Sequence, residues 1–140
     1  MPMSNSSLTE KINENKGGFV GLYIYRSPKK NHDTLMQINN KVTNTFKDCG
    51  MYSFEVFQLG STEDMMEFVN ISKTISADKE DEVWLEIQTY RDRKHVDEVM
   101  AKMENNEDMK MLYQQFLDII TPGSRCIFGG FNRLDGIGFV

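Results

Sequence analysis

The order in which strand and helix signals follow one another constrains the fold of this chain more than any other feature. Four runs rich in aromatic and β-branched residues predict strands: Phe19 to Arg26, Tyr52 to Leu59, Glu82 to Tyr90, and Arg125 to Leu134. Helical periodicity lies between the first and second runs and between the third and fourth. The resulting β-α-β-β-α-β order predicts an α+β fold of the ferredoxin-like, split-βαβ type, an antiparallel four-stranded sheet with its helices on one face.

The two helical regions have sequence signals at their ends. The first is expected to begin near residues 31–33 and to end at Gly50, and the second to be capped by Asp92. Their buried stripes are expected to be Leu35, Ile38, Val42 and Phe46, and then Val96, Val99, Met100 and Met103. The pair Asn105-Asn106 interrupts the second region, so a further helix is predicted before the last strand.

Composition fits one globular domain. Of the 140 residues, 39% are hydrophobic and 26% are charged, which suffices for a core without disulfides. Residues 1–17 are polar and read as a flexible N-terminal leader, so residues 18–140 are expected to form the single domain. Within this domain, between the second and third predicted strands, residues 60–81 form a long polar connection that fits a short helix, an irregular strand extension or a mobile flap.

Charge and cysteine content narrow the classes of function. The net charge of −5 argues against nucleic acid, which needs a basic face, and no apolar run is long enough to span a membrane. Without a secretory signal, a cytoplasmic location is expected. Cys49 and Cys126 lack a CxxC partner, so both are interpreted as reduced, mostly buried thiols, and no metal or cofactor is predicted.

Strand alternation predicts a homodimer. One side of the first and third strands is aliphatic, and this side is expected to face the helices; it comprises Val20, Leu22, Ile24, Val83, Leu85 and Ile87. The other side is aromatic with interleaved polar groups, and comprises Phe19, Tyr23, Tyr25, Trp84, Glu86, Gln88 and Tyr90. Leaving that aromatic side in water loses the burial free energy of each large side chain, roughly 1.5–3 kcal/mol. A second copy of the chain is therefore expected to cover it. The alternative is a monomer in which residues 60–81 cover it.

Three segments carry a resemblance to a known family. Residues 18–20, Tyr90 to Val99 (YRDRKHVDEV) and Arg125 to Phe131 (RCIFGGF) resemble the YbaA-like family of uncharacterised small proteins. That family belongs to the dimeric α/β-barrel superfamily, so the resemblance implies this fold and a homodimer. It places the family's arginine, histidine and acidic positions on Arg93, His95 and Asp97, and its basic residue before the last strand on Arg125.

Among residues that can carry chemistry, His95 is the candidate catalytic group, because an imidazole exchanges protons near neutral pH. Arg93 and Arg125 suit a carboxylate or enolate, and Asp97 completes the predicted ligand-binding cluster. Tyr23 and Trp84 are candidates for an aromatic pocket wall. Each candidate also has a structural interpretation: a helix-start histidine, surface ion pairs, and interface aromatics. Gly129-Gly130 lies within a strand and is expected to permit a bulge or the close approach of another chain or a ligand.

Two functions remain open at this point. The first is a small-molecule enzyme of the cofactor-independent oxygenase or isomerase type, in which His95 moves a proton and an arginine steadies an oxyanion. The second is a ligand-binding or regulatory module without chemistry. Haem binding is a weaker third hypothesis, with His32 and His95 as the axial candidates. A small organic ligand is expected in a pocket within each subunit, between sheet and helices, whereas a module without chemistry could also use its dimer as a scaffold.

Overall fold

A sheet of four antiparallel strands organises the molecule. The computed structural model describes residues 17–121 and 126–139. Its strands are β1 (Phe19–Pro28), β2 (Ser53–Gln58), β3 (Asp81–Tyr90) and β4 (Ile127–Asn132), in the order β2-β3-β1-β4 across the sheet. All three pairings are antiparallel, with Leu22 opposite both Ile87 of β3 and Gly129 of β4. The α+β class and all four predicted strands are therefore confirmed.

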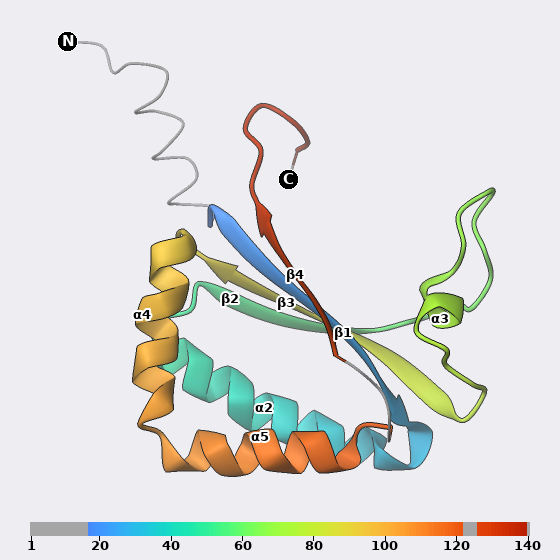
Figure 1. Ribbon diagram of the computed structural model, residues 1–140, viewed down its shortest axis with the longest axis horizontal. Helices are drawn as coiled ribbons and strands as arrows, with labels where there is room; N and C mark the ends of the chain where they lie inside the picture. Colours follow the sequence, from blue (N-terminus) through green and yellow to red (C-terminus); the bar gives the residue numbers. More distant parts are fainter. Residues whose placement is uncertain (1–16, 122–125, 140) are drawn as a thin grey trace.

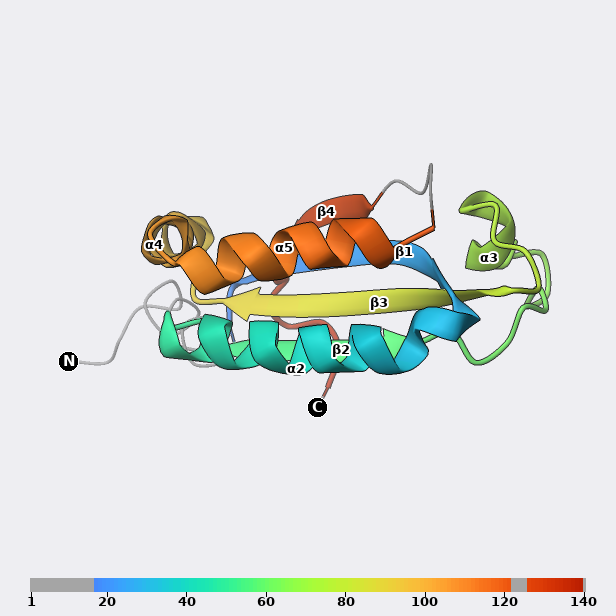
Figure 2. The same cartoon turned by 90° about the horizontal axis from the view of Figure 1, so that it is seen from below.

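The helices lie on one side of this sheet. Helix α2 (His32–Asp48) follows a short 3-10 turn, η1 (Lys29–Asn31), and helices α4 (Arg93–Glu104) and α5 (Glu107–Ile119) follow β3. Figures 1 and 2 show α2 and α5 side by side beneath the sheet, with α4 at one end. The other side of the sheet carries no helix among the described residues.

Local signals set the helix ends as the sequence predicts. Asp92 Oδ1 accepts a hydrogen bond of 2.8 Å from the backbone N–H of His95, which caps α4. Asn105 and Asn106 separate α4 from α5, and Asn106 Oδ1 caps α5 by accepting from the Met109 N–H. At the end of α2, Gly50 takes a φ of 96°, a left-handed conformation that glycine adopts without strain.

The connection over residues 60–80 contains a short helix, α3 (Ile71–Thr74), which is one of the three alternatives for this segment, and a β-bridge between Met65 and Phe68. The Asn70 side chain ties the loop together by donating to the carbonyls of Ser61 and Glu63. Figure 1 shows this segment standing beyond the end of the sheet, on the side away from α2 and α5. It does not cover the aromatic side of β1 and β3.

The prediction of which sheet face lies under the helices was wrong. The aromatic side faces the helices: Tyr25, Trp84 and Tyr90 are at most 2% exposed and pack in clusters with helix residues. The aliphatic residues Leu22 and Ile87, on the opposite side, are only half-buried. The physical reason is that the polar atoms of the aromatic side find partners inside. The Tyr25 hydroxyl, for instance, donates to Glu86 at 2.7 Å.

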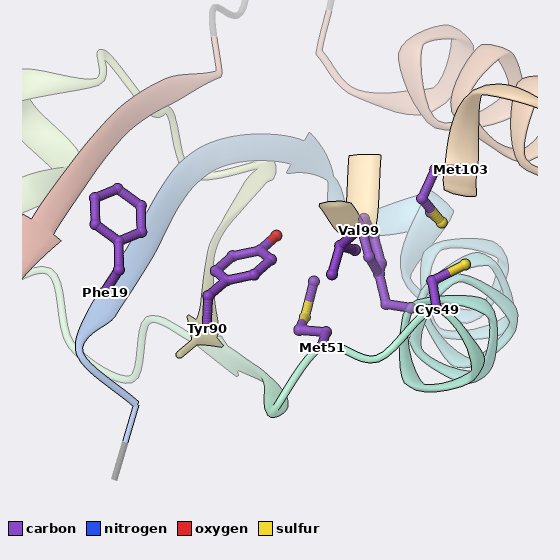
Figure 3. Close-up of a cluster of buried hydrophobic side chains, with 7 residues drawn as sticks. Phe19, Cys49, Met51, Tyr90, Val99 and Met103 are labelled. Atoms are coloured by element: carbon purple, nitrogen blue, oxygen red, sulfur yellow. The ribbon is translucent and has the colours of Figure 1, made fainter. Parts of the chain in front are cut away.

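The core consists of two separate clusters. The first joins the start of β1 and the end of β3 to α2 and α4, and contains Phe19, Phe46, Cys49, Met51, Tyr90, Val99 and Met103 (Figure 3). The second, at the other end of the sheet, contains Tyr25, Leu35, Trp84 and Ile120. The space between the two clusters is where the candidate site lies.

Candidate functional site

A cavity of about 690 Å³ lies between the sheet and the helices. Its sheet wall is formed by Tyr23 of β1 and by Glu86 and Gln88 of β3. The opposite wall is apolar and includes Val42 of α2 and Leu112 of α5. A cavity of this size, largely apolar with a few convergent polar groups, has the properties of a small-molecule site.

We place the mouth of the cavity between α5 and β4, because most of the exposed side chains on its lining come from these two elements or the residue next to them. They include Tyr113, Leu117, Cys126 and Phe128. Phe128 packs on the Tyr23 ring with the two ring centroids 4.9 Å apart, which joins β4 to the sheet wall. Every strand residue of β4 except Gly129 is exposed, so this edge strand separates the cavity from solvent with little packing behind it.

Glu86 is the acidic group buried in the sheet wall. The residue is 9% exposed, and its Oε1 accepts the hydrogen bond from the Tyr25 hydroxyl. Desolvation raises the pKa of the Glu86 carboxyl, while hydrogen bonds from Tyr25 and Gln88 oppose the rise. A carboxyl with a raised pKa in a cleft marks a candidate functional group.

A hydrogen-bonded network holds Glu86 in place. The Asn39 side-chain amide donates to the Tyr25 hydroxyl oxygen at 3.3 Å, and the Tyr90 hydroxyl donates to Gln88 Oε1 at 2.8 Å. Burial raises the pKa of both tyrosines far above the usual value, so both hydroxyls remain protonated donors. The network therefore fixes the side chain positions before any ligand arrives, as a preorganised site requires.

Cys126 lies at the mouth of the cavity. The residue is exposed, which corrects the prediction that both cysteines are mostly buried; Cys49 is buried as expected. Desolvation within the mouth, and secondarily the charge of Glu86, raise the pKa of the Cys126 thiol to about 11. The thiol is therefore protonated near neutral pH and is not an activated nucleophile.

The structure separates the residues predicted from sequence. Tyr23 lines the cavity, whereas Trp84 lies in the second core cluster, where its ring stacks on Tyr25 at a centroid distance of 6.5 Å. His95 is buried at the start of α4, and its Nδ1 accepts a hydrogen bond of 3.0 Å from the Arg91 N–H. His95 is not among the residues lining the cavity.

The rest of the predicted cluster also lies away from the cavity. Arg93 is exposed, and its guanidinium carbon stands 5.7 Å from the centre of the Phe19 ring. Asp97 is exposed on α4, and Arg125 lies outside the described residues. Within the described residues, no group of three or more His, Cys, Asp or Glu side chains is placed to hold a metal ion, and no helix has the length and hydropathy to cross a membrane.

Sequence reasoning did not select Glu86 or the walls from α5. Glu86 was assigned to the aromatic side of β3, but that side was expected to face a second copy of the chain. The signal that identifies it is an acid in the middle of the strand side that carries Trp84, Gln88 and Tyr90, whereas Glu82, the other acid of that side, stands near the start of the strand. A carboxyl between such neighbours must either be neutral or hydrogen-bonded, and both conditions indicate a built site.

The fold and the cavity define a small α+β protein with an internal cavity under an antiparallel sheet. Residues 18–118 match the family described as "Protein of unknown function (DUF1428)". Because the match spans most of the chain, including β1 through α4 and nearly all of α5, the chain belongs to that family. No curated protein matches the sequence.

Proposed function

We propose that this protein binds a small, largely apolar organic molecule in the cavity between its sheet and its helices. The observation that carries the proposal is the cavity itself, about 690 Å³ in volume, with the buried Glu86 on one wall and apolar side chains on the other. Burying an apolar ligand surface there contributes roughly 25 cal/mol for each Å² removed from water. The hydrogen-bonded Glu86 carboxyl in the sheet wall would fix the orientation of the ligand.

A substitution that fills the cavity tests this proposal. Val42 lines the cavity from α2, so Val42→Trp should occupy the ligand's space. The probe is N-phenyl-1-naphthylamine, an uncharged fluorophore that brightens in apolar sites. We expect wild-type protein to bind the probe and Val42→Trp to bind it at least tenfold more weakly.

Val69→Trp is the matched control, because Val69 is 64% exposed in the 60–80 segment and does not line the cavity. It should bind the probe as wild type does. Circular dichroism establishes that both variants are folded. Equal affinity of wild type and Val42→Trp would refute the cavity as the binding site.

A catalytic function is the second candidate, and Glu86 supports it. A carboxyl with a raised pKa that lines a cavity is suited to take a proton from a bound molecule, as an isomerase requires. The proton-transfer role of His95, with Arg93 and Asp97 beside it, stays a prediction, and those residues do not line this cavity. Consumption of a substrate over many turnovers separates an enzyme from a binding module.

We also propose that the functional unit is a homodimer built on the ferredoxin-like plan, with the helix-free sheet face as the interface. The strand order and the antiparallel pairings support the plan. The helix-free face is aliphatic: its central rows hold Ile24 beside Leu85 and Leu22 beside Ile87. Phe57 and Ile127 flank them on β2 and β4 and are 45% and 44% exposed.

A second copy is the occupant that this face favours. One apolar row runs across all four strands and holds Phe57, Leu85, Ile24 and Ile127, whereas the neighbouring row of Ile87 and Leu22 ends at the exposed Glu55 on β2. A row as wide as the sheet matches the extent of another such sheet rather than a short peptide. A contiguous exposed apolar surface of this kind marks an interaction site on a soluble protein. Two-fold dimers, in which the same surface meets itself, are the commonest oligomers.

A further inference from the structure

The hydrogen bonds around Glu86 all run toward its carboxylate. Asn39 donates to Tyr25, and Tyr25 donates to Glu86. Tyr90 donates to Gln88, which leaves the Gln88 amide group as a donor toward Glu86. The donors of the sheet wall are therefore directed at Glu86. A carboxylate has about four lone-pair positions, so it retains acceptor capacity for a ligand.

The charges that line the cavity do not neutralise this carboxylate. Within the described part of the chain, Lys110 is the only basic side chain on the lining. Its side chain is 62% exposed, and its Nζ lies 3.2 Å from a carboxylate oxygen of Glu107. Glu104, the other charged lining residue, is an exposed acid. The described lining thus offers a buried negative charge without a buried positive partner.

We propose that the cavity selects molecules that join an apolar body to a protonated amine, with the Glu86 carboxylate as the counter-ion. This rests on the proposed binding function and adds the chemical class of the ligand. A charge pair is far stronger at the base of an apolar cavity than in water, because the effective dielectric constant is lower. An ammonium group brings three N–H donors and no acceptor, which complements a wall that ends in an acceptor.

Three matched probes test the ligand class: 4-phenylbutylamine, 4-phenylbutanol and 4-phenylbutanoate. They share one apolar body and differ in the terminal charge. We expect isothermal titration calorimetry near pH 7.5 to show the amine binding wild-type protein at least tenfold more tightly than the alcohol, with the carboxylate weakest. Competition by N-phenyl-1-naphthylamine should show that the probes occupy the cavity.

Glu86→Gln isolates the counter-ion. Glutamine keeps the oxygen that accepts from Tyr25 but loses the charge. The affinity for the amine should therefore fall to the affinity for the alcohol, whereas the affinity for the alcohol should not change. Glu67→Gln, which removes an exposed acid of the 60–80 segment that does not line the cavity, should retain the amine preference. Circular dichroism establishes that both variants are folded.

The outcomes separate this inference from the function on which it rests. If wild type binds neither N-phenyl-1-naphthylamine nor any of the three probes, or if Val42→Trp weakens the binding of none of them, the proposed function and the ligand class fall together. If N-phenyl-1-naphthylamine binds in the cavity but none of the three probes does, only the ligand class is overturned. If the alcohol binds in the cavity but the amine binds no better, or if the amine preference survives Glu86→Gln, only the ligand class is overturned. Tightest binding by the carboxylate overturns it as well.

Discussion

At the scale of single residues, the molecule places a carboxyl where it costs folding free energy. Glu86 is 9% exposed, and desolvation raises its pKa above the ordinary value of 4.5. A residue that lowers stability and lines a cavity fits a functional role, since functional sites commonly trade stability for activity. The hydrogen bonds from Tyr25 and Gln88 reduce that cost without removing it.

Glu86→Gln should therefore stabilise the protein in a pH-dependent way. Because the folded pKa is raised, the folded state holds the proton more tightly than the unfolded chain, so wild-type stability falls as pH rises through that range. We expect the variant to gain about 1 kcal/mol in the free energy of unfolding at pH 8. The gain should vanish below pH 4.5, the ordinary pKa of the group.

Urea unfolding at several pH values measures this effect, with Glu104→Gln as the exposed control that should change little. A variant less stable than wild type at pH 8 would contradict the argument. It would mean that the hydrogen bonds to the charged carboxylate outweigh its desolvation.

At the scale of elements, the sequence predicts which residues form strands and helices. It does not predict which face of the sheet the helices cover. Alternation sorted Tyr25 and Trp84 from Leu22 and Ile87 correctly, because side chains of a strand point to alternate sides. The greater hydrophobicity of the aliphatic side then led to the wrong prediction that this side lies under the helices. Local patterns carry no information on tertiary hydrogen bonds such as Tyr25 to Glu86, which let the aromatic side be buried. The cavity lies between sheet and helices, where a pocket is predicted, and Tyr23 lines it as expected. The rest of its lining was not predicted, since α5 and β3 bring those residues together from distant parts of the chain.

The glycine pair of β4 shows the same mixture of success and failure. The predicted close approach of another chain or a ligand stays a prediction, whereas the groups that approach the two glycines in the structure are aromatic rings of the same chain. A Cβ on Gly130 would stand 2.6 Å from Cζ of Phe19, which belongs to the first core cluster. Neither glycine forms a bulge, since the pairing with β1 is regular, with Gly130 opposite Gly21.

Gly130→Ala should therefore destabilise the protein by about 1–3 kcal/mol, the usual cost of overpacking. Urea unfolding measures the loss. The control is Gly60→Ala, where an added Cβ meets nothing within 4 Å. If both variants unfold at the same urea concentration, the Phe19 ring moves aside freely and the edge strand is not held by that contact.

At the scale of the whole molecule, the two sides of the sheet have different tasks. The side under the helices holds the polar network and the cavity, whereas the open side presents aliphatic rows and the exposed Phe57 and Ile127. Leaving such a surface in water forgoes roughly 25 cal/mol per Å² of apolar area. The proposed second copy recovers that free energy.

A double variant, Phe57→Glu with Ile127→Glu, tests the dimer. Both side chains are already exposed in the single chain, so the charges should break association and spare the fold. Light scattering should give twice the chain mass for wild type and the chain mass for the variant. Only wild type should show an unfolding temperature that rises with protein concentration.

Met111→Glu is the control, since Met111 is 61% exposed on α5 and does not line the cavity. It should remain dimeric. A wild-type protein that scatters as a monomer at micromolar concentration would rule out the proposed interface.

The single tryptophan of the chain makes the molecule its own optical reporter. Trp84 is 2% exposed in the second core cluster, and its indole Nε1 donates to Glu82 Oε1 at 3.3 Å. Its fluorescence therefore senses one end of the sheet, while the first cluster, across the cavity, contains no tryptophan. Circular dichroism averages over both ends. Coincident transitions by the two signals mean that the halves unfold as one cooperative unit, whereas an early or late fluorescence change means that the cavity divides the molecule into two independently melting parts.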